Sequence, residues 1–270
     1  MDLGVADRVV IVTGATANIG RAIALDFAVE GAKVVAVGRD ADAGERVITQ
    51  ALGRGAHAAI FVQAELLDPL SPARIRDAAE QLGPIVILVN NVGGNVGAGF
   101  FVDSDPATWQ ADIDLTLMTT LRMTHAVLPG MIARGAGRII NIGSTAGLVG
   151  DYMLPVYSAA KSAIHGFTRV LAKEVGQHGV TVNCVAPYGT VSDDPEAFSR
   201  GNRFHPENGF FRKAFINTNP SDLAKRRRTG PLARQLAKPE EVSAAVLYLA
   251  SSRADFITGQ VLQVDGGTLL

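Results

Sequence analysis

The sequence predicts a single α/β domain built on a doubly wound parallel sheet. Short apolar segments rich in β-branched residues alternate with longer amphipathic segments along the 270 residues. This alternation is typical of a parallel sheet whose crossover helices cover both of its faces. Hydrophobic residues make up 47% of the chain, enough for a sizeable core, and no second core or internal repeat is evident. We therefore expect one domain over residues 1–270.

The overall composition argues against several classes of partner, cofactor and location. The formal net charge of −1 predicts neither a nucleic-acid partner nor an anionic membrane. Cys184 is the only cysteine, so no intrachain disulfide is expected. The chain shows no signal peptide and no stretch of about 18 apolar residues, which predicts a cytoplasmic protein. Its five histidines have no zinc spacing, so we expect no catalytic metal.

The first strand and its following turn predict a nucleotide site. Residues 9–12 form a continuous β-branched run, as in a strand that is buried on both faces. A glycine-bearing turn ends at Gly20, and an amphipathic helix is expected over residues 21–30. Strand, glycine turn and helix together present backbone N–H groups to a pyrophosphate. The alternative is a plain strand-to-helix turn in which the glycines only allow the backbone conformation and bind no ligand.

The second predicted strand, residues 33–37, ends where a dinucleotide fold meets the adenosine ribose. An acidic residue at this point binds the 2′-hydroxyl of NAD, whereas an arginine accommodates the 2′-phosphate of NADP. The strand leads into Gly38 and Arg39, while Asp40 is placed to cap a helix that begins near Ala41. We therefore expect NADP(H), with NAD(H) as the other possibility. The alternative for Arg39 is a solvated loop charge.

The remaining elements continue the alternation. Ser71 and Pro72 are expected to open a helix. Further strands are expected over residues 58–62, 85–89, 138–142 and 180–186, helices over 106–134, from Tyr157 to about 179 and over 239–250, and a last strand and turn within 256–267.

Tyr157 and Lys161 are the residues that best indicate chemistry. Residues four apart lie on the same face of a helix. A free phenol has a pKa of about 10, and a nearby ammonium favours the phenolate and brings it toward acid/base work. Ser144, thirteen positions before the tyrosine, could hold a substrate oxygen against the phenol. Taken alone, the Tyr-x-x-x-Lys pattern equally describes an exposed helix face.

Residues 193–230 form an insertion without a clear strand. Between residues 193 and 234 the chain has nine basic and five acidic residues, a local charge of +4 within a nearly neutral protein. Long insertions in compact domains are often active-site lids. We expect a substrate lid here, with a solvated surface as the alternative for the basic run Arg226-Arg227-Arg228.

Taken together, these motifs resemble the short-chain dehydrogenase/reductase family from Asp7 to Gly267. Residues 13–20 are similar to its T-G-x-x-x-G-x-G turn, with Asn18 at the middle glycine, where left-handed backbone is tolerated. Residues 90–93 resemble its N-N-A-G segment. Residues 187–192 resemble its P-G-x-x-x-T loop, with Tyr188 at the glycine and Ser192 at the threonine. The resemblance implies a seven-stranded parallel sheet and a homo-oligomer, a tetramer or a dimer.

The resemblance also assigns residues to roles. It implies catalytic roles for Ser144, Tyr157, Lys161 and Asp114, the last standing where the family usually has Asn. It implies cofactor binding by Gly14, Thr16, Asn18, Ile19, Gly20, Arg39, Glu65, Leu66, Asn91, Gly93, Tyr157, Lys161, Pro187, Gly189, Thr190 and Ser192, and substrate binding by Ser144, Asn95, Tyr157 and Tyr188.

The implied function is hydride transfer between a nicotinamide and a small-molecule alcohol or ketone. The substrate stays open: a secondary alcohol or cyclic ketone, or an anionic compound such as a hydroxy acid, a diol carboxylate or a CoA thioester. A 3-oxoacyl carrier-protein reductase is one alternative. A non-catalytic dinucleotide-sensing regulator is another, favoured by the departures at Asn18, Asp114 and Tyr188.

Overall fold

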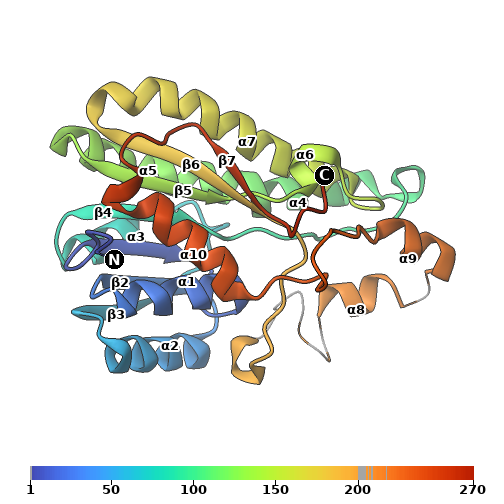
Figure 1. Ribbon diagram of the computed structural model, residues 1–270, viewed down its shortest axis with the longest axis horizontal. Coiled ribbons are helices and arrows are strands. Elements are labelled where there is room, and N and C mark those ends of the chain that lie inside the picture. The colour runs from blue at the N-terminus through green and yellow to red at the C-terminus, as the bar shows by residue number, and fades with distance from the viewer. Residues whose placement is uncertain (1, 200–204, 206, 208, 217) are drawn as a thin grey trace.

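One seven-stranded parallel sheet, with helices on both faces, forms the molecule (Figure 1). The computed structural model describes residues 2–199, 205, 207, 209–216 and 218–270. The strand order is β3-β2-β1-β4-β5-β6-β7, and every neighbouring pair is parallel. The expected doubly wound sheet is confirmed. The strands are β1 Val9–Thr13, β2 Lys33–Gly38, β3 Ala58–Gln63, β4 Ile85–Asn90, β5 Gly137–Ile142, β6 Val180–Pro187 and β7 Val261–Val264.

Side chains of alternate residues in the central strands point to opposite faces of the sheet. Val10 and Val12 of β1 belong to the core under three helices: α1 Asn18–Val29, α2 Ala41–Arg54 and α10 Pro239–Ala250. Val9 and Ile11 point to the opposite core, under α3 Ser71–Glu80, α5 Thr119–Arg134 and α7 Pro155–Val175. Side chains alternate along a strand, so an apolar run without polar interruptions is needed to fill both layers.

The strand order reverses beside β1, and this reversal positions the site. The chain runs outward from β1 through β2 to β3, then returns to place β4 on the other side of β1. The loops after β1 and β4 consequently diverge to opposite faces. They leave a crevice at the carboxyl ends of the strands, which is where open α/β sheets bind ligands.

The helix expected over residues 106–134 is interrupted. A short 3₁₀ turn, Pro106–Thr108, leads into α4 Trp109–Ile113, and a π-helical turn, Asp114–Met118, separates α4 from α5. Within this turn Thr116 is buried, and its hydroxyl donates to the Gly94 carbonyl at 2.9 Å and accepts from the Gly94 N–H at 3.1 Å. Such π turns are frequent at functional sites, and here the turn joins the helix to the loop after β4.

The expected lid segment is described only in part, because residues 200–204, 206, 208 and 217 lie outside the described residues. Its described parts include the helices α8 Phe210–Ala214 and α9 Pro220–Arg226. These two helices stand beyond the carboxyl ends of the strands, below the short helix α6 Ala146–Val149 in the view of Figure 1. Among the described helices, none combines the length and the apolarity needed to cross a membrane.

Candidate active site

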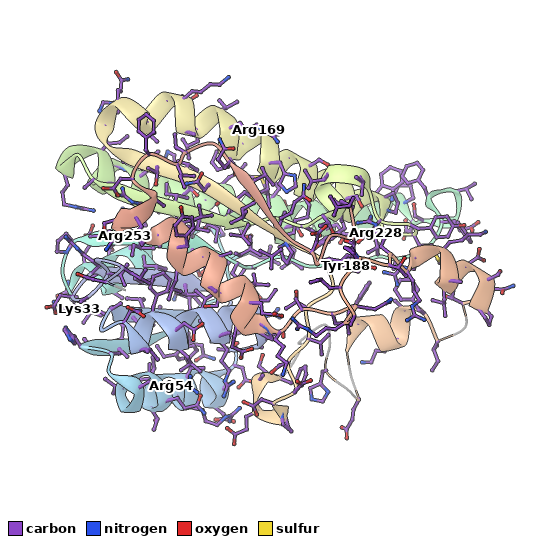
Figure 2. All side chains as sticks on the ribbon, in the orientation of Figure 1. Lys33, Arg54, Arg169, Tyr188, Arg228 and Arg253 are labelled. Carbon is purple, nitrogen blue, oxygen red and sulfur yellow. The ribbon has the colours of Figure 1, made fainter. Side chains whose placement is uncertain are left out.

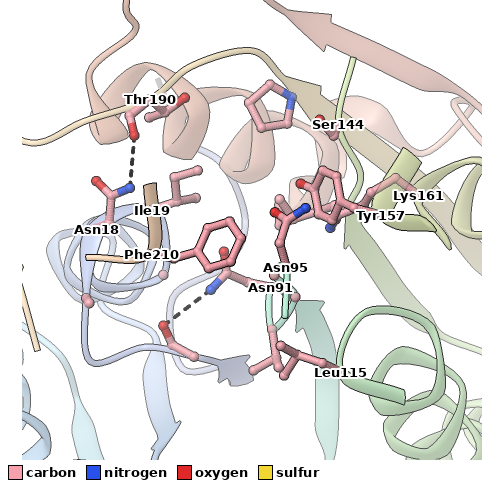
Figure 3. Close-up of a pocket in the computed structure, with 18 of the residues that line it drawn as sticks. Asn18, Ile19, Asn91, Asn95, Leu115, Ser144, Tyr157, Lys161, Thr190 and Phe210 are labelled. Atoms are coloured by element: carbon pink, nitrogen blue, oxygen red, sulfur yellow. Dashed lines mark hydrogen bonds between the residues drawn. The ribbon is translucent and has the colours of Figure 1, made fainter. Parts of the chain in front are cut away.

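A cavity of about 660 Å³ opens at the carboxyl ends of the central strands (Figure 3). Its walls come from the loops after β1, β2, β3, β4, β5 and β6 together with α7 and the α8–α9 region. Of the residues predicted for the site, it brings together Gly14, Thr16, Asn18, Ile19, Gly20, Arg39, Glu65, Leu66, Asn91, Gly93, Asn95, Ser144, Tyr157, Lys161, Pro187, Tyr188, Gly189 and Thr190. Asp114 and Ser192 do not line it.

In the glycine turn after β1, backbone atoms of Gly14 and Gly20 lie too close together for a side chain at Gly20. Asn18 begins α1 with a left-handed φ of 44°, as expected of an asparagine at a glycine position. Its side-chain nitrogen donates to the Thr190 carbonyl at 3.0 Å, which ties the turn to the loop after β6 (Figure 3). A Cβ atom at Gly20 would lie 2.1 Å from the Gly14 carbonyl oxygen. Only glycine therefore fits this position without opening the turn.

The same turn fits the phosphates of a dinucleotide. The first N–H groups of a helix need acceptors, and α1 has no side-chain cap to supply one. Asn91 supports the turn from below, because its Nδ2 donates to the Thr13 carbonyl at 2.9 Å. An anion at this helix end would meet donors that the protein leaves without a cap.

Beyond the end of β2 the cavity is lined by Arg39 and Asp40. Asp40 caps α2 by accepting from the Ala43 N–H at 3.1 Å, as expected. A Cβ atom at Gly38 would lie 2.4 Å from Thr16 Cγ2, so a longer side chain there would displace Thr16. Arg39 lies 3.3 Å from Glu65 in an ion pair whose side chains are 60% and 45% exposed. Its guanidinium is thus held at the rim, open to solvent.

Ser144, Tyr157 and Lys161 converge on the opposite end of the cavity (Figure 3). Tyr157 is 9% and Lys161 3% exposed, although both belong to a helix. The Lys161 ammonium donates to the Ile142 carbonyl at 2.6 Å and lies 5.8 Å from the centre of the Tyr157 ring. The Ser144 hydroxyl accepts from the Ala146 N–H at 3.1 Å. The exposed-helix alternative for this pair is excluded by its burial.

Asp114 and Ser192 have other surroundings. The Asp114 carboxylate accepts from the Gln110 side chain at 3.0 Å, one helical turn earlier and away from the cavity. The Ser192 hydroxyl accepts from the Asp194 N–H at 3.1 Å, within its own loop. Across the described residues there is no group of three or more His, Cys, Asp or Glu able to hold a metal ion.

Two buried groups that the sequence did not single out support the site. Asp112 accepts from the Val96 N–H at 2.6 Å and so fixes the loop that contains Asn95. His165 lies behind the Ser144 loop: Cβ atoms at Gly143 and Gly147 would fall 2.5 and 2.7 Å from its ring. Burial, with the nearby charges of Lys161 and Arg169, lowers the pKa of His165 to about 4. His165 follows Lys161 by four residues on the same helix, and this spacing was the feature of the sequence that could have placed it near the site.

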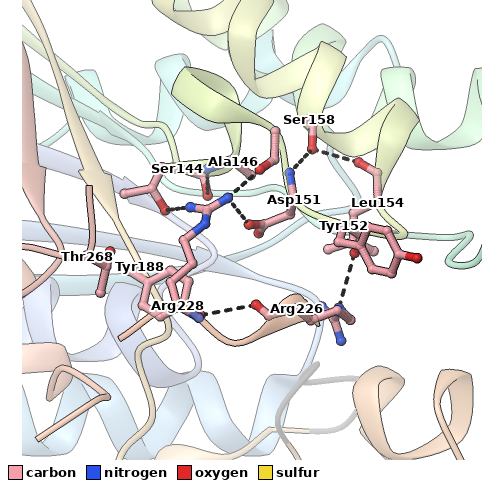
Figure 4. A network of polar contacts seen from close by, with 12 residues as sticks. Ser144, Ala146, Asp151, Tyr152, Leu154, Ser158, Tyr188, Arg226, Arg228 and Thr268 are labelled. Atoms are coloured by element: carbon pink, nitrogen blue, oxygen red, sulfur yellow. Dashed lines mark hydrogen bonds and ion pairs between the residues drawn. The ribbon is translucent and has the colours of Figure 1, made fainter. Parts of the chain in front are cut away.

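Arg228 joins three segments of the site (Figure 4). Its guanidinium contacts the Asp151 carboxylate at 2.5 Å, the Gly150 carbonyl, and the Thr145 hydroxyl at 3.3 Å. Its backbone N–H donates to the Tyr188 hydroxyl at 3.1 Å, and its guanidinium lies 5.6 Å from the centre of that ring. Arg228 and Tyr188 lie together in Figure 2. Hydrogen bonds of Arg228 thus connect the chain beyond α9 to Thr145, next to Ser144, and to Tyr188 in the loop after β6.

Removal of the Arg228 side chain should destabilise the fold. The Arg228 and Asp151 side chains are only 18% and 21% exposed, so removing one leaves the other charge partly desolvated. For Arg228→Met we expect the free energy of unfolding, from urea titration, to fall by about 1–3 kcal/mol. Arg227→Met, at an exposed neighbour, should stay within about 0.5 kcal/mol. Equal decreases in the two variants would mean that the ion pair does not stabilise the protein.

Comparison with known proteins places the chain among oxidoreductases. A family model described as short chain dehydrogenase matches residues 8–200, and one described as Enoyl-(Acyl carrier protein) reductase matches residues 212–268. Acetoacetyl-CoA reductase of Allochromatium vinosum is 33% identical over 265 residues, covering 97% of this chain and 99% of that protein. 3-oxoacyl-[acyl-carrier-protein] reductase FabG of Vibrio harveyi is 34% identical over 262 residues, covering 96% of each.

A solved structure agrees along the whole length. L-Sorbose reductase from Gluconobacter frateurii, complexed with NADPH and L-sorbose, has a TM-score of 0.84 to this chain at 27% identity. The match covers 100% of this chain and 99% of that one. The chain therefore shares the overall architecture of that enzyme.

Proposed function

The chain belongs to the short-chain dehydrogenase/reductase family, and we propose that Ser144, Tyr157 and Lys161 are the residues with which this NAD(P)-dependent oxidoreductase interconverts a secondary alcohol and a ketone. The observation that carries the proposal is the burial of the tyrosine and lysine, one turn apart on α7, in a cavity that also contains the glycine turn. An acid/base group and a dinucleotide cradle in one cavity suit a carbonyl reduction.

Each of the three side chains has a task that its position supports. The Tyr157 hydroxyl gives a proton to the carbonyl oxygen in reduction and takes it back in oxidation. The Ser144 hydroxyl, at the start of the Ala146 turn, holds that oxygen. The Lys161 ammonium, fixed by the Ile142 carbonyl, favours the charged form of the phenol and is placed to hold the nicotinamide ribose. The bound nicotinamide would supply or accept the hydride.

Turnover with NADPH tests the proposal and separates it from the alternatives. A decrease of NADPH absorbance with a panel of cyclic ketones, oxo acids and oxoacyl thioesters would identify an enzyme. A dinucleotide-sensing regulator would bind NADPH without consuming it. A 3-oxoacyl carrier-protein reductase, favoured by the FabG relative, would prefer acyl-carrier-protein thioesters to all other members of the panel.

We propose NADP(H) as the preferred cofactor, with Arg39 binding the 2′-phosphate. Arg39→Ala should then raise the Kd for NADPH roughly ten- to a hundred-fold, the range for one charge-assisted hydrogen bond. It should leave the Kd for NADH nearly unchanged, as measured by titration calorimetry. Arg54→Ala removes the same charge at the far end of α2 (Figure 2) and should change neither value. A wild-type protein that binds NADH more tightly than NADPH would contradict the assignment.

The cytoplasmic location and the homo-oligomer stay predictions. For the substrate, we propose that α8 and α9 form one wall of its site, since Phe210 and Arg226 both line the cavity. The local excess of basic residues in this region favours an anionic substrate.

A further inference from the structure

The structure separates three consecutive arginines that the sequence presents as one basic run. Arg228 is committed to the ion pair with Asp151 and to the Gly150 carbonyl (Figure 4). Arg227 is exposed, and its guanidinium donates to the exposed Gln235 side chain at 3.4 Å. Arg226 lines the cavity. Of the three, Arg226 is the one placed to contact a substrate.

The Arg226 guanidinium is fixed in position by two neighbours. Its Nε donates to the Tyr152 carbonyl at 3.2 Å, and its central carbon lies 3.9 Å from the centre of the Phe215 ring. Cation–π contact with the ring and the bond at Nε together restrict the long side chain. A guanidinium that is already oriented loses less conformational entropy when it binds a planar carboxylate or a phosphate.

The charges around this end of the cavity favour an anion. Lys161 and Arg226 line it, and Arg228 lies just behind its wall. Asp151 also lines the cavity, and its carboxylate is 2.5 Å from Arg228, which offsets its charge. On α9 itself, Asp222 is paired with Lys225 at 3.0 Å. Among the residues named here, all of which the structure describes, the positive side chains outnumber the negative ones.

We propose that Arg226 binds an anionic group of the substrate, a carboxylate or a phosphate, and selects acidic oxo compounds over neutral ones. The inference rests on the proposed ketoreductase function, because it requires that the substrate occupy the cavity beside Tyr157. It goes beyond that function in naming the residue that recognises the anionic group and the preference for acidic over neutral substrates that follows from it. Arg227 and Arg228 have no part in this recognition.

Two pairs of probes, each with and without a charge, test the proposal. Levulinate and its methyl ester differ in a carboxylate, whereas acetoacetyl-CoA and acetoacetyl-pantetheine differ in the phosphates of CoA and the adenosine that they carry. For wild type we expect a lower KM for the charged member of at least one pair. The same order is expected for their dissociation constants with the protein–NADP⁺ complex, measured by calorimetry. The pair that responds identifies the source of the charge.

Arg226→Ala should remove this preference. We expect the KM and the Kd of the preferred charged probe to rise roughly ten- to a hundred-fold, and those of its neutral partner to stay within about threefold. Arg226→Lys should recover part of the affinity. Arg227→Ala, with the same change of charge one residue later, should leave both members unchanged.

The outcomes distinguish this inference from the function on which it rests. The inference is overturned if wild type prefers neither charged probe, if Arg226→Ala affects both members of a pair equally, or if Arg227→Ala has the same effect. In each case, turnover of any ketone with NADPH would leave the proposed ketoreductase function standing. If no ketone of the panel causes the wild-type protein to consume NADPH, the proposed function itself fails.

Discussion

Replacement of Tyr157 by phenylalanine is expected to lower kcat roughly 10²–10⁴-fold, the range for removal of a general acid/base. The ring packs against Ala146, Leu154 and Phe215, and phenylalanine preserves this packing without the hydroxyl. The fold and the Kd for NADPH should therefore stay close to those of wild type. Steady-state kinetics together with calorimetric titration of NADPH would separate an effect on chemistry from an effect on binding.

Tyr152→Phe is the matched control for this substitution. Tyr152 also lies near the cavity, but it is 38% exposed and its hydroxyl lies 3.5 Å from Asp222. Removal of that hydroxyl should change kcat by no more than about threefold, because an exposed side chain has water as an alternative partner. If Tyr157→Phe retained more than about a tenth of wild-type turnover, Tyr157 would not be the acid/base group.

The predicted site residues converge because of the sheet topology. In sequence, Gly14, Arg39, Asn91, Ser144 and Tyr188 are far apart, yet each follows a strand of the same parallel sheet. The carboxyl ends of parallel strands share one edge, so any set of polar or glycine residues that follows them is brought to one crevice. The continuous apolar runs that fill both core layers, alternating with amphipathic segments, made the doubly wound parallel sheet predictable.

Other features of the site depend on local backbone geometry and could not be predicted from the sequence. The π-helical turn at Asp114–Met118 adds one residue to a helical turn, and no residue in it marks the insertion. The expected continuous helix gave no indication of the two bonds between Thr116 and Gly94. Asp112 was similarly hidden, because its partners are backbone N–H groups some fifteen residues away that depend on the shape of a loop.

The departure at Tyr188 has an explanation only in three dimensions. The family motif has glycine at this position, and on sequence alone the tyrosine suggested altered chemistry. In the structure its hydroxyl accepts from the Arg228 N–H at 3.1 Å, forty residues further along the chain. The tyrosine supports the segment after α9 and lines the cavity, so the substitution is compatible with catalysis. Side-chain partners at this separation are not encoded in any local pattern.

Gly20→Ala is expected to have the largest effect on cofactor binding. The new methyl group would lie 2.1 Å from the Gly14 carbonyl oxygen and 2.5 Å from Asn91 Nδ2, so the turn has to open. Overpacking of this kind costs about 1–3 kcal/mol in free energy of unfolding. Each hydrogen bond from the turn to the pyrophosphate is worth roughly a factor of ten to a hundred in affinity. If the opened turn cannot form about two of these bonds, the Kd for NADPH should rise roughly 10²–10⁴-fold.

Gly53→Ala tests whether the position of the glycine, rather than the substitution itself, causes this weaker binding. Gly53 also lies in a helix, α2, but no atom stands within 4 Å of the place its Cβ would occupy. Alanine there should raise the free energy of unfolding by about 0.5–1 kcal/mol, since it forms helix more readily than glycine. Urea titration should thus give opposite signs for the two variants, and only Gly20→Ala should weaken NADPH binding in calorimetry. Unchanged NADPH affinity in Gly20→Ala would mean that the turn after β1 does not hold the cofactor, whatever the sign of its effect on stability.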